Sequence, residues 1–418
     1  MTIPTSLAAL RKRALPAVVA LLLGSSALLL GAVPAQAAAA PQITVVAGAP
    51  EGPFAYAEYN GLTYLAGIKT GDIYPSLFSF NGTTFTPIAG SPLGVNELVV
   101  VDGKLLIKAM NPGFTDFVFY SYDGTSVVPL VHSFVSPQDF VLVGGILYFA
   151  AEYGSGLELT TYDGTSFGVI TGYTPDVFSI SVFGGAIYFQ ANDGVDERLF
   201  IVSPGSSVAA AVPTSPLDPG ELTVYNGLAY LGASDGSTYH LYSFDGVTFA
   251  IVPTPASTGA GALTVFNGKL YFVADDGVDF RLYSYNSVGG AVVAVPDGST
   301  ETNDVFVFDG KLMFPGPDSP TTYTLKSFDG TTTSIVAGAA AEGPYNFVQV
   351  GAVVYFTGNV FAPGGAQMYQ LRTLAAATAA GALAATGSNP VPLAGAGLAL
   401  LLLGAAGIAA SRRARRAA

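Results

Sequence analysis

The stretch "FNGKLYF" at residues 266–272 joins an Asn-Gly pair to a run of apolar residues. Seven further stretches of the same form begin at residues 59, 101, 143, 183, 225, 308 and 350. Their second turn residue recurs at intervals of 42, 42, 40, 42, 41, 42 and 42 residues. A period this constant over eight units is typical of repeat architectures, in which each unit is one supersecondary element.

Most units carry a second turn signal in which Asn-Gly or Asp-Gly lies between aromatic and β-branched residues. Examples are "LFSFNGTTFTPI" at residues 77–88 and "YDGTS" at residues 122–126 and 162–166. Both signals favour tight hairpins, since a type I′ turn needs positive φ at both central residues. Two hairpins per unit give four short strands.

Four strands in about 42 residues, repeated eight times, predict an all-β fold, a β-propeller of eight four-stranded blades. A linear β-solenoid is the alternative, and the ends of the repeat region decide between the two. "VVAGAPEGP" at residues 45–53 nearly repeats "IVAGAAAEGP" at residues 335–344. Residues 43–46 therefore correspond to a fourth strand, which the last unit lacks. We expect a propeller over residues 43–374 whose eighth blade is completed by the N-terminal strand, which leaves no open sheet edge.

Two segments, "GGAIYFQANDGVDERLF" (residues 184–200) and "GKLYFVADDGVDFRLYSY" (residues 268–285), resemble the bacterial ELWxxDGT repeat family. The resemblance rests on "LYFxAxDG" and on the "DGT" turns, and it covers about residues 43–374. It implies an exported, often surface-attached protein and carries no catalytic residues.

Acidic residues and Asn recur six residues before the turn glycine of several units. We call these eight sites the ring positions, since the first strand of a propeller blade commonly lines the central channel. They hold Ala55, Glu97, Asp139, Ser179, Glu221, Ala262, Asp304 and Asn346. Gathered like charges raise some pKa values or recruit a cation, so Glu97, Asp139, Glu221, Asp304 and Asn346 form a candidate ligand ring. The alternative is that each side chain accepts hydrogen bonds from backbone donors at its strand start.

We expect no cofactor, and calcium, at the ring or in two Asp-Gly loops, is the one alternative that the composition allows. "NDGVDE" contains Asp193 and Asp196, and "DDGVD" contains Asp276 and Asp279. Both loops place oxygen ligands around a glycine but lack the alternating ligands and closing Glu of a calcium loop. The alternative is a polar turn that needs Asp-Gly for its backbone.

Catalytic signatures are sparse. The chain has no cysteine and two histidines, which belong to no metal-binding or nucleophile motif. We expect no enzyme. The alternative is a glycan hydrolase or lyase with channel-mouth carboxylates as acid and base.

The N-terminus reads as a secretory signal peptide over residues 1–37. A basic "RKR" precedes the apolar run 14–33 and a small-residue cleavage site at Ala35, Ala37 and Ala38. An uncleaved anchor is the alternative. Seven of the 16 basic residues and none of the 29 acidic ones lie in the terminal segments, so the remainder has a net charge of −20. Such a charge disfavours nucleic acid and anionic lipid as partners.

The C-terminus carries an Ala-rich spacer (residues 375–382) and a three-part segment (residues 383–418). A short motif precedes an apolar stretch at 391–410 and a basic tail at 411–418. Twenty residues at about 1.5 Å each cross one bilayer core of about 30 Å, and the arginines mark its cytoplasmic side.

This order resembles the LPxTG-type cell-wall sorting signal of Gram-positive surface proteins, in its LAxTG variant. The motif is Leu383, Ala384, Ala385, Thr386 and Gly387. The resemblance implies that a sortase cuts after Thr386 and joins it covalently to peptidoglycan, so that membrane retention is transient. A permanent membrane anchor on a structural surface protein is the alternative. We expect a cell-wall propeller for binding, adhesion or display, with an extracellular protein or glycan as ligand.

Overall fold

The computed structural model describes residues 42–154, 156–255, 258–286, 289–300, 304–319, 322–337, 342–350, 352–361 and 367–375. Every regular element in these ranges is a β-strand. No helix among the described residues is long and apolar enough to cross a bilayer. The predicted signal peptide, the sorting motif and the apolar stretch 391–410 lie outside the described residues.

The strands form eight sheets of four strands, which we number as blades in chain order. Blade 1 consists of β2 (Glu51–Tyr59), β3 (Leu62–Ile68), β4 (Ser76–Phe80) and β5 (Phe85–Pro87), and blade 2 of β6 (Glu97–Val101), β7 (Lys104–Met110), β8 (Phe117–Tyr122) and β9 (Val127–Pro129). Blade 3 consists of β10 (Val135–Val143), β11 (Ile146–Glu152), β12 (Leu157–Tyr162) and β13 (Phe167–Val169), and blade 4 of β14 (Thr174–Phe183), β15 (Ala186–Asn192), β16 (Glu197–Val202) and β17 (Ala210–Ala211). Blade 5 consists of β18 (Thr223–Tyr225), β19 (Leu228–Ser234), β20 (Tyr239–Phe244) and β21 (Phe249–Ile251), and blade 6 of β22 (Thr258–Phe266), β23 (Lys269–Asp275), β24 (Phe280–Tyr285) and β25 (Val292–Ser299). Blade 7 consists of β26 (Phe306–Phe308), β27 (Lys311–Ser319), β28 (Thr322–Phe328) and β29 (Thr333–Ile335), and blade 8 of β30 (Glu342–Val350), β31 (Val353–Phe361), β32 (Gln367–Ala375) and β1 (Gln42–Val45).

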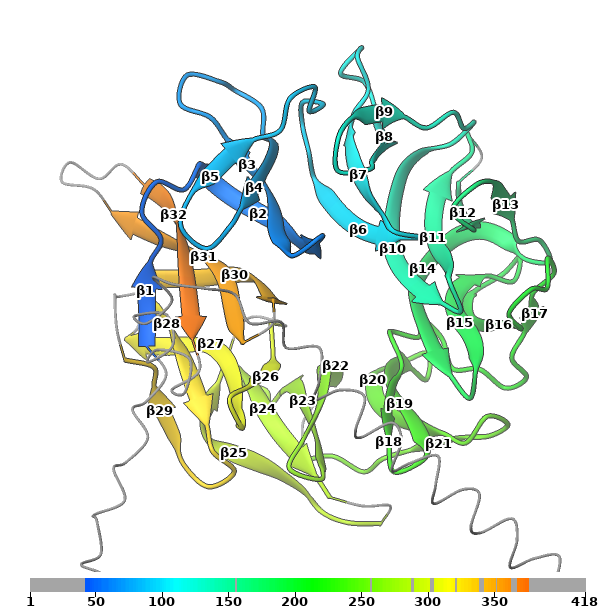
Figure 1. The fold of residues 1–418 in the computed structure, drawn as a ribbon. Coiled ribbons are helices and arrows are strands. Elements are labelled where there is room, and N and C mark those ends of the chain that lie inside the picture. The colour runs from blue at the N-terminus through cyan, green and yellow to red at the C-terminus, as the bar shows by residue number, and fades with distance from the viewer. Residues whose placement is uncertain are drawn as a thin grey trace, which may run out of the picture. The chain divides into compact units, whose positions relative to one another are not determined.

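The eight blades stand in a ring, as Figure 1 shows, with inner strands such as β6, β10 and β22 toward its centre. The predicted eight-bladed β-propeller is confirmed, and so is its closure. Strand β1 is the fourth strand of blade 8 and pairs antiparallel with β32, from Gln42 opposite Ala375 to Val45 opposite Arg372.

In blades 1 to 7, the turn between the first and second strand has the expected geometry. Asn60 and Gly61 have φ of 49° and 73°, and Asn267 and Gly268 have φ of 45° and 70°. Positive φ at both central residues defines the type I′ turn, which matches the twist of the flanking strands. The recurring Asn-Gly, Asp-Gly and Gly-Gly pairs are therefore backbone requirements.

The turn between the third and fourth strand differs from the type I′ prediction. Only the glycine is left-handed there, with φ of 96° at Gly124 and at Gly164. The preceding aspartate instead starts a four-residue loop, and its Oδ1 accepts hydrogen bonds from the amides two and three residues on. For Asp163 these donors are Thr165 N at 2.8 Å and Ser166 N at 2.7 Å. The Asp-Gly dipeptide thus occurs in two types of turn, and the number of residues between the paired strands determines which type forms.

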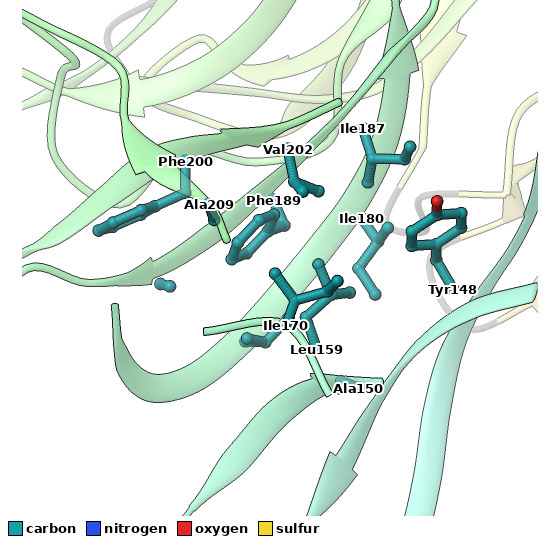
Figure 2. Close-up of a cluster of buried hydrophobic side chains, with 12 residues drawn as sticks. Tyr148, Ala150, Leu159, Ile170, Ile180, Ile187, Phe189, Phe200, Val202 and Ala209 are labelled. Atoms are coloured by element: carbon teal, nitrogen blue, oxygen red, sulfur yellow. The ribbon is translucent and has the colours of Figure 1, made fainter. Parts of the chain in front are cut away.

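The hydrophobic core lies between blades. The largest cluster of buried side chains, drawn in Figure 2, combines Tyr148, Leu159 and Ile170 of blade 3 with Phe189 and Phe200 of blade 4. Alternation along each strand gives every blade two apolar faces, one for each neighbour. No blade can bury its faces alone, so the ring is one cooperative unit.

The interface between blades 8 and 1 joins the two ends of the ring. It stacks Tyr56 on Tyr355, with ring centroids 5.8 Å apart. Thr357 Oγ1 and Tyr56 Oη both donate to the Pro53 carbonyl, at 2.6 and 3.0 Å. Burial raises the pKa of Tyr56 well above its ordinary value, so the phenol stays a donor.

We expect the buried face of β1 to carry the closure. Ile43 is buried against Leu374 and Phe356, whereas Val45 on the same strand is exposed. Ile43→Ala should lower the free energy of unfolding by about 3 kcal/mol, and Val45→Ala by less than about 1 kcal/mol. Urea unfolding of the exported protein measures both. Equal effects of the two substitutions would contradict a closure held by the apolar face of β1.

Candidate functional site

The ring positions lie in or just before the inner strands, and most have an unusual backbone. In β2, β10, β14, β22 and β30 the residue there has φ between 50° and 59°: Ala55, Asp139, Ser179, Ala262 and Asn346. The register with the second strand shifts at this point in all five strands, as in a β-bulge. Asp and Asn tolerate this conformation better than branched residues do. This conformation accounts for Asp139 and Asn346, whereas Glu97, Glu221 and Asp304 do not have positive φ.

A second left-handed residue precedes each of these by three positions, which the sequence analysis missed. The five residues are Gly52, Ser136, Asp176, Gly259 and Gly343. A signal exists in the sequence, because "EGP" occurs at residues 51–53 and again at residues 342–344, at the same distance from the following turn.

Asp139 lies within electrostatic range of two other ring carboxylates, Glu97 and Glu221. Desolvation is the larger cause of the raised pKa of Glu97, which is partly buried, and of Glu221, which keeps an exposed surface, and Asp139 raises the pKa of both further. Glu97 also pairs with Lys108, whose Nζ lies 3.4 Å from Glu97 Oε2 and 5.6 Å from the ring centre of Phe117. The structure therefore brings together ring acids of blades 2, 3 and 5.

The remaining ring residues are arranged differently. Asp139 Oδ2 accepts a hydrogen bond of 2.7 Å from Ser179 N, which ties blade 3 to blade 4. Asp304 has a pKa raised by burial alone, and Asn346 is exposed. Glu97 is thus paired with a lysine side chain, and Asp139 accepts a backbone amide of the next blade rather than one at its own strand start.

Hydroxyl groups two residues further along the chain also join successive blades. Ser181 Oγ accepts from Leu222 N at 2.9 Å, Thr223 Oγ1 donates to Leu263 O at 3.2 Å, and Thr264 Oγ1 donates to Val305 O at 3.0 Å. These bonds connect blades 4, 5, 6 and 7 in turn. They show that the inner strands carry a belt of cross-blade contacts next to the ring positions.

The calcium candidates lie in the loops between the second and third strands of blades 4 and 6. Asp193 Oδ1 accepts from the amides of Val195 and Asp196 at 2.9 and 3.0 Å. Asp276 Oδ1 does the same with Val278 and Asp279, both at 2.9 Å. These bonds lower the pKa of Asp193 and Asp276.

Arginines complete both loops. Arg198 contacts the carboxylates of Asp193 and Asp196 at 3.6 and 3.1 Å, and Arg281 lies 3.4 Å from Asp276. Among the described residues, no group of three or more His, Asp or Glu side chains is placed to hold a metal ion. The carboxylates of Asp193 and Asp276 hold their turns through the amide bonds given above.

The two histidines have structural partners as well. His132 Nε2 accepts from Phe119 N at 3.2 Å, and its Nδ1 donates to Phe134 O at 2.8 Å. Its ring stacks on Phe134, and burial lowers its pKa. His240 Nε2 lies 3.1 Å from Asp235 Oδ2 on the surface. Neither histidine contacts the ring carboxylates.

A groove of about 500 Å³ lies at the closure between blades 8 and 1. Its lining includes Val45, Phe80, Tyr355 and Ala375. The groove is mostly apolar, and the last described residue, Ala375, forms part of its wall.

No protein-family model and no curated protein sequence matches the chain. Among solved structures, the computationally designed protein Ika8 is similar, with 14% identity and a TM-score of 0.50 over 78% of this chain and 98% of that one. Dipeptidyl peptidase 4 of Porphyromonas gingivalis has 10% identity and a TM-score of 0.50 over 74% of this chain and 56% of that one. The β-propeller domain of the Trilobed protease from Pyrococcus furiosus has 12% identity and a TM-score of 0.47, over 71% of this chain and 98% of that one. At such identities the likeness concerns the fold alone.

The raised pKa values of Glu221 and Asp304 predict a pH-dependent stability. The folded state holds these protons more tightly than the unfolded chain, so the ionised carboxylates destabilise the fold above their folded-state pKa. Glu221→Gln with Asp304→Asn should raise the unfolding midpoint at pH 7. The gain should fall as the pH drops toward the ordinary values of 4.5 and 3.8 and vanish below them.

Asp163→Ala is the control of opposite sign. Hydrogen bonds from amides and hydroxyls lower the pKa of Asp163, so its stabilising effect is present at neutral pH and is lost as the pH falls through its folded-state pKa. This substitution should be more harmful at pH 7 than at pH 3. Thermal unfolding from pH 3 to 8 gives both profiles, and a double variant that is less stable at pH 7 than wild type would refute the assignment.

Proposed function

We propose that this protein is an exported β-propeller, attached covalently to the cell wall, that binds a partner outside the cell. The observation that carries the proposal is the order of segments after the last strand. β32 ends at Ala375, seven residues precede Leu383, and the LAATG motif is followed by the apolar stretch and the arginines. Seven extended residues span at most about 25 Å, so the ring would stand close to its attachment point.

The proposed attachment is an exchange of one amide bond for another. A sortase breaks the peptide bond between Thr386 and Gly387, and the amino group of Gly387 leaves with residues 387–418. The carbonyl carbon of Thr386 then forms an amide with an amino group of peptidoglycan. The apolar stretch would retain the chain in the membrane until this step.

The contacts of two ring carboxylates, Glu97 and Asp139, support binding rather than catalysis. Asp139 accepts a backbone amide, and Glu97 is paired with Lys108. These partners occupy the two carboxylates in contacts within the fold, whereas a general acid or base must be available to its substrate.

Glycan hydrolysis or lysis is a second candidate, and one observation favours it: Glu97 and Glu221 both have raised pKa values near Asp139. A protonated Glu221 could act as a general acid. If so, wild-type protein should release new chain ends from purified cell-wall glycan, and Glu221→Gln should reduce that release at least about a hundredfold. Absence of any release by the wild type would leave binding as the function.

Thr386→Ala tests the attachment. Wild-type protein should be released from cell envelopes by muramidase digestion, as a form of mass consistent with cleavage after Thr386. The Thr386→Ala protein should stay in the membrane fraction, because the chain no longer carries the threonine of the LAxTG motif. Ser388→Ala, two residues away, is the matched control and should behave as wild type. An unchanged distribution of the Thr386→Ala protein would contradict wall sorting.

A further inference from the structure

Blades 1 and 2 depart from the repeat at the loops between their second and third strands. In blades 4, 5 and 6 this loop is a four-residue turn that begins with Asp193, Asp235 or Asp276. In blade 1 it is "KTGDIYP" (residues 69–75), and in blade 2 it is "NPGFTD" (residues 111–116). Both departures add apolar side chains that the turn itself does not need.

These side chains gather on the surface. Tyr74 and Phe114 stack with centroids 5.0 Å apart and an interplanar angle of 28°. Tyr74 is 38% exposed and Phe114 is 45% exposed. Ile73, next to Tyr74 in the chain, is 82% exposed, and Leu93, in the linker between blades 1 and 2, is 42% exposed. We call these four residues the aromatic patch. Clustered exposed apolar side chains mark interaction sites more often than single ones do.

The aromatic patch is held rigidly although it consists of loops. Val95 N donates to Pro75 O, and Met110 N donates to Leu93 O, both at 3.1 Å, so the linker between the blades lies hydrogen-bonded between the two loops. Asn111 Oδ1 accepts from the amides of Gly113 and Thr115 at 3.1 and 3.2 Å. This fixes Phe114 at a φ of 56°. A preorganised site loses little conformational entropy on binding.

The charge around the aromatic patch selects among partners. In an antiparallel blade the loop between strands two and three lies on the same face as the start of strand one. The patch therefore shares a face with Glu97, Asp139 and Glu221, and its own loops carry Asp72 and Asp116. With 29 acidic and nine basic residues outside the terminal segments, the ring attracts cations.

We propose that the aromatic patch is the centre of a docking surface for a basic polypeptide segment, one that presents an aromatic or aliphatic side chain between lysines or arginines. The apolar side chain would pack on Tyr74 and Phe114, and the flanking cations would face the acids of blades 1 to 3. The inference rests on the proposed binding function, but it does not depend on wall attachment.

The test uses the full chain, recovered from whichever envelope fraction holds it and captured on a biosensor. The probe is the peptide Gly-Lys-Trp-Lys-Gly-Lys-Trp-Lys-Gly, compared with versions that have Glu for Lys or Ala for Trp. Wild-type protein should bind the probe at least about tenfold more tightly than either reference peptide. Tyr74→Ala with Phe114→Ala should weaken that binding about tenfold, as expected for aromatic anchors.

Matched controls come from the same face. Val195 and Val278 are 83% and 85% exposed in the equivalent loops of blades 4 and 6, and their joint replacement by Ala should change binding less than about twofold. Ile73→Ser, at a mostly exposed side chain, should weaken binding without altering the unfolding midpoint.

Four results would overturn the proposal: no preference for the probe, an undiminished Tyr74→Ala and Phe114→Ala double variant, tighter binding of the Glu peptide, or self-association in sedimentation that the double variant abolishes. The last would identify a second copy as the occupant. Failure of Thr386→Ala to change localisation would refute wall sorting and leave this binding result standing.

Discussion

The pairing of β1 with β32 is the contact on which the ring depends. Seven blades are continuous in sequence, but blade 8 is assembled from segments 329 residues apart, as the Thr44–Thr373 hydrogen bond shows. Without β1, the nine residues of β32 would form the outer edge of blade 8, and a long exposed edge is prone to pairing with other chains. With it, Ile43 completes the apolar cluster between blades 7 and 8. Closure therefore stabilises the fold and leaves blade 8 with a shorter outer edge, the four residues of β1.

The other blade interfaces are similar in their apolar packing and different in their polar contacts. Tyr59 and Tyr225 each donate to the turn glycine carbonyl of the next blade, Gly103 or Gly268. Hydroxyls of Ser181, Thr223 and Thr264 join blades 4 to 7. The repeat thus specifies the shape of each interface, and these individual bonds make the interfaces non-identical, which disfavours register errors between blades.

The period and the turn glycines sufficed to predict the blade number and the ring closure, because both follow from chain connectivity. The two forms of the Asp-Gly turn could not be separated in the same way. Asp102-Gly103 has φ of 48° and 67°, whereas in Asp123-Gly124 only the glycine is left-handed. The difference depends on how many residues separate the paired strands, and that is a matter of register. The bulges escaped prediction for the same reason.

The ring positions were identified from the sequence, but their roles were not. A carboxylate that accepts a backbone amide of the next blade, as Asp139 does, has the same spacing in the sequence as one that faces solvent. The stack of Tyr74 on Phe114 joins two units whose loops are each irregular, so periodicity could not reveal it. The two irregular loops of blades 1 and 2 meet in this stack, and the proposed docking surface rests on that contact.

A disulfide between β1 and β32 tests the closure most directly. Thr44 and Thr373 are direct partners in the register, with their hydroxyl oxygens 2.7 Å apart, and the chain has no cysteine. The Thr44→Cys and Thr373→Cys double variant should oxidise to a single intramolecular disulfide, seen as faster migration on non-reducing gels and a linked peptide pair in mass spectrometry. Free thiols, or disulfides only between molecules, would contradict a ring closed by its N-terminal strand.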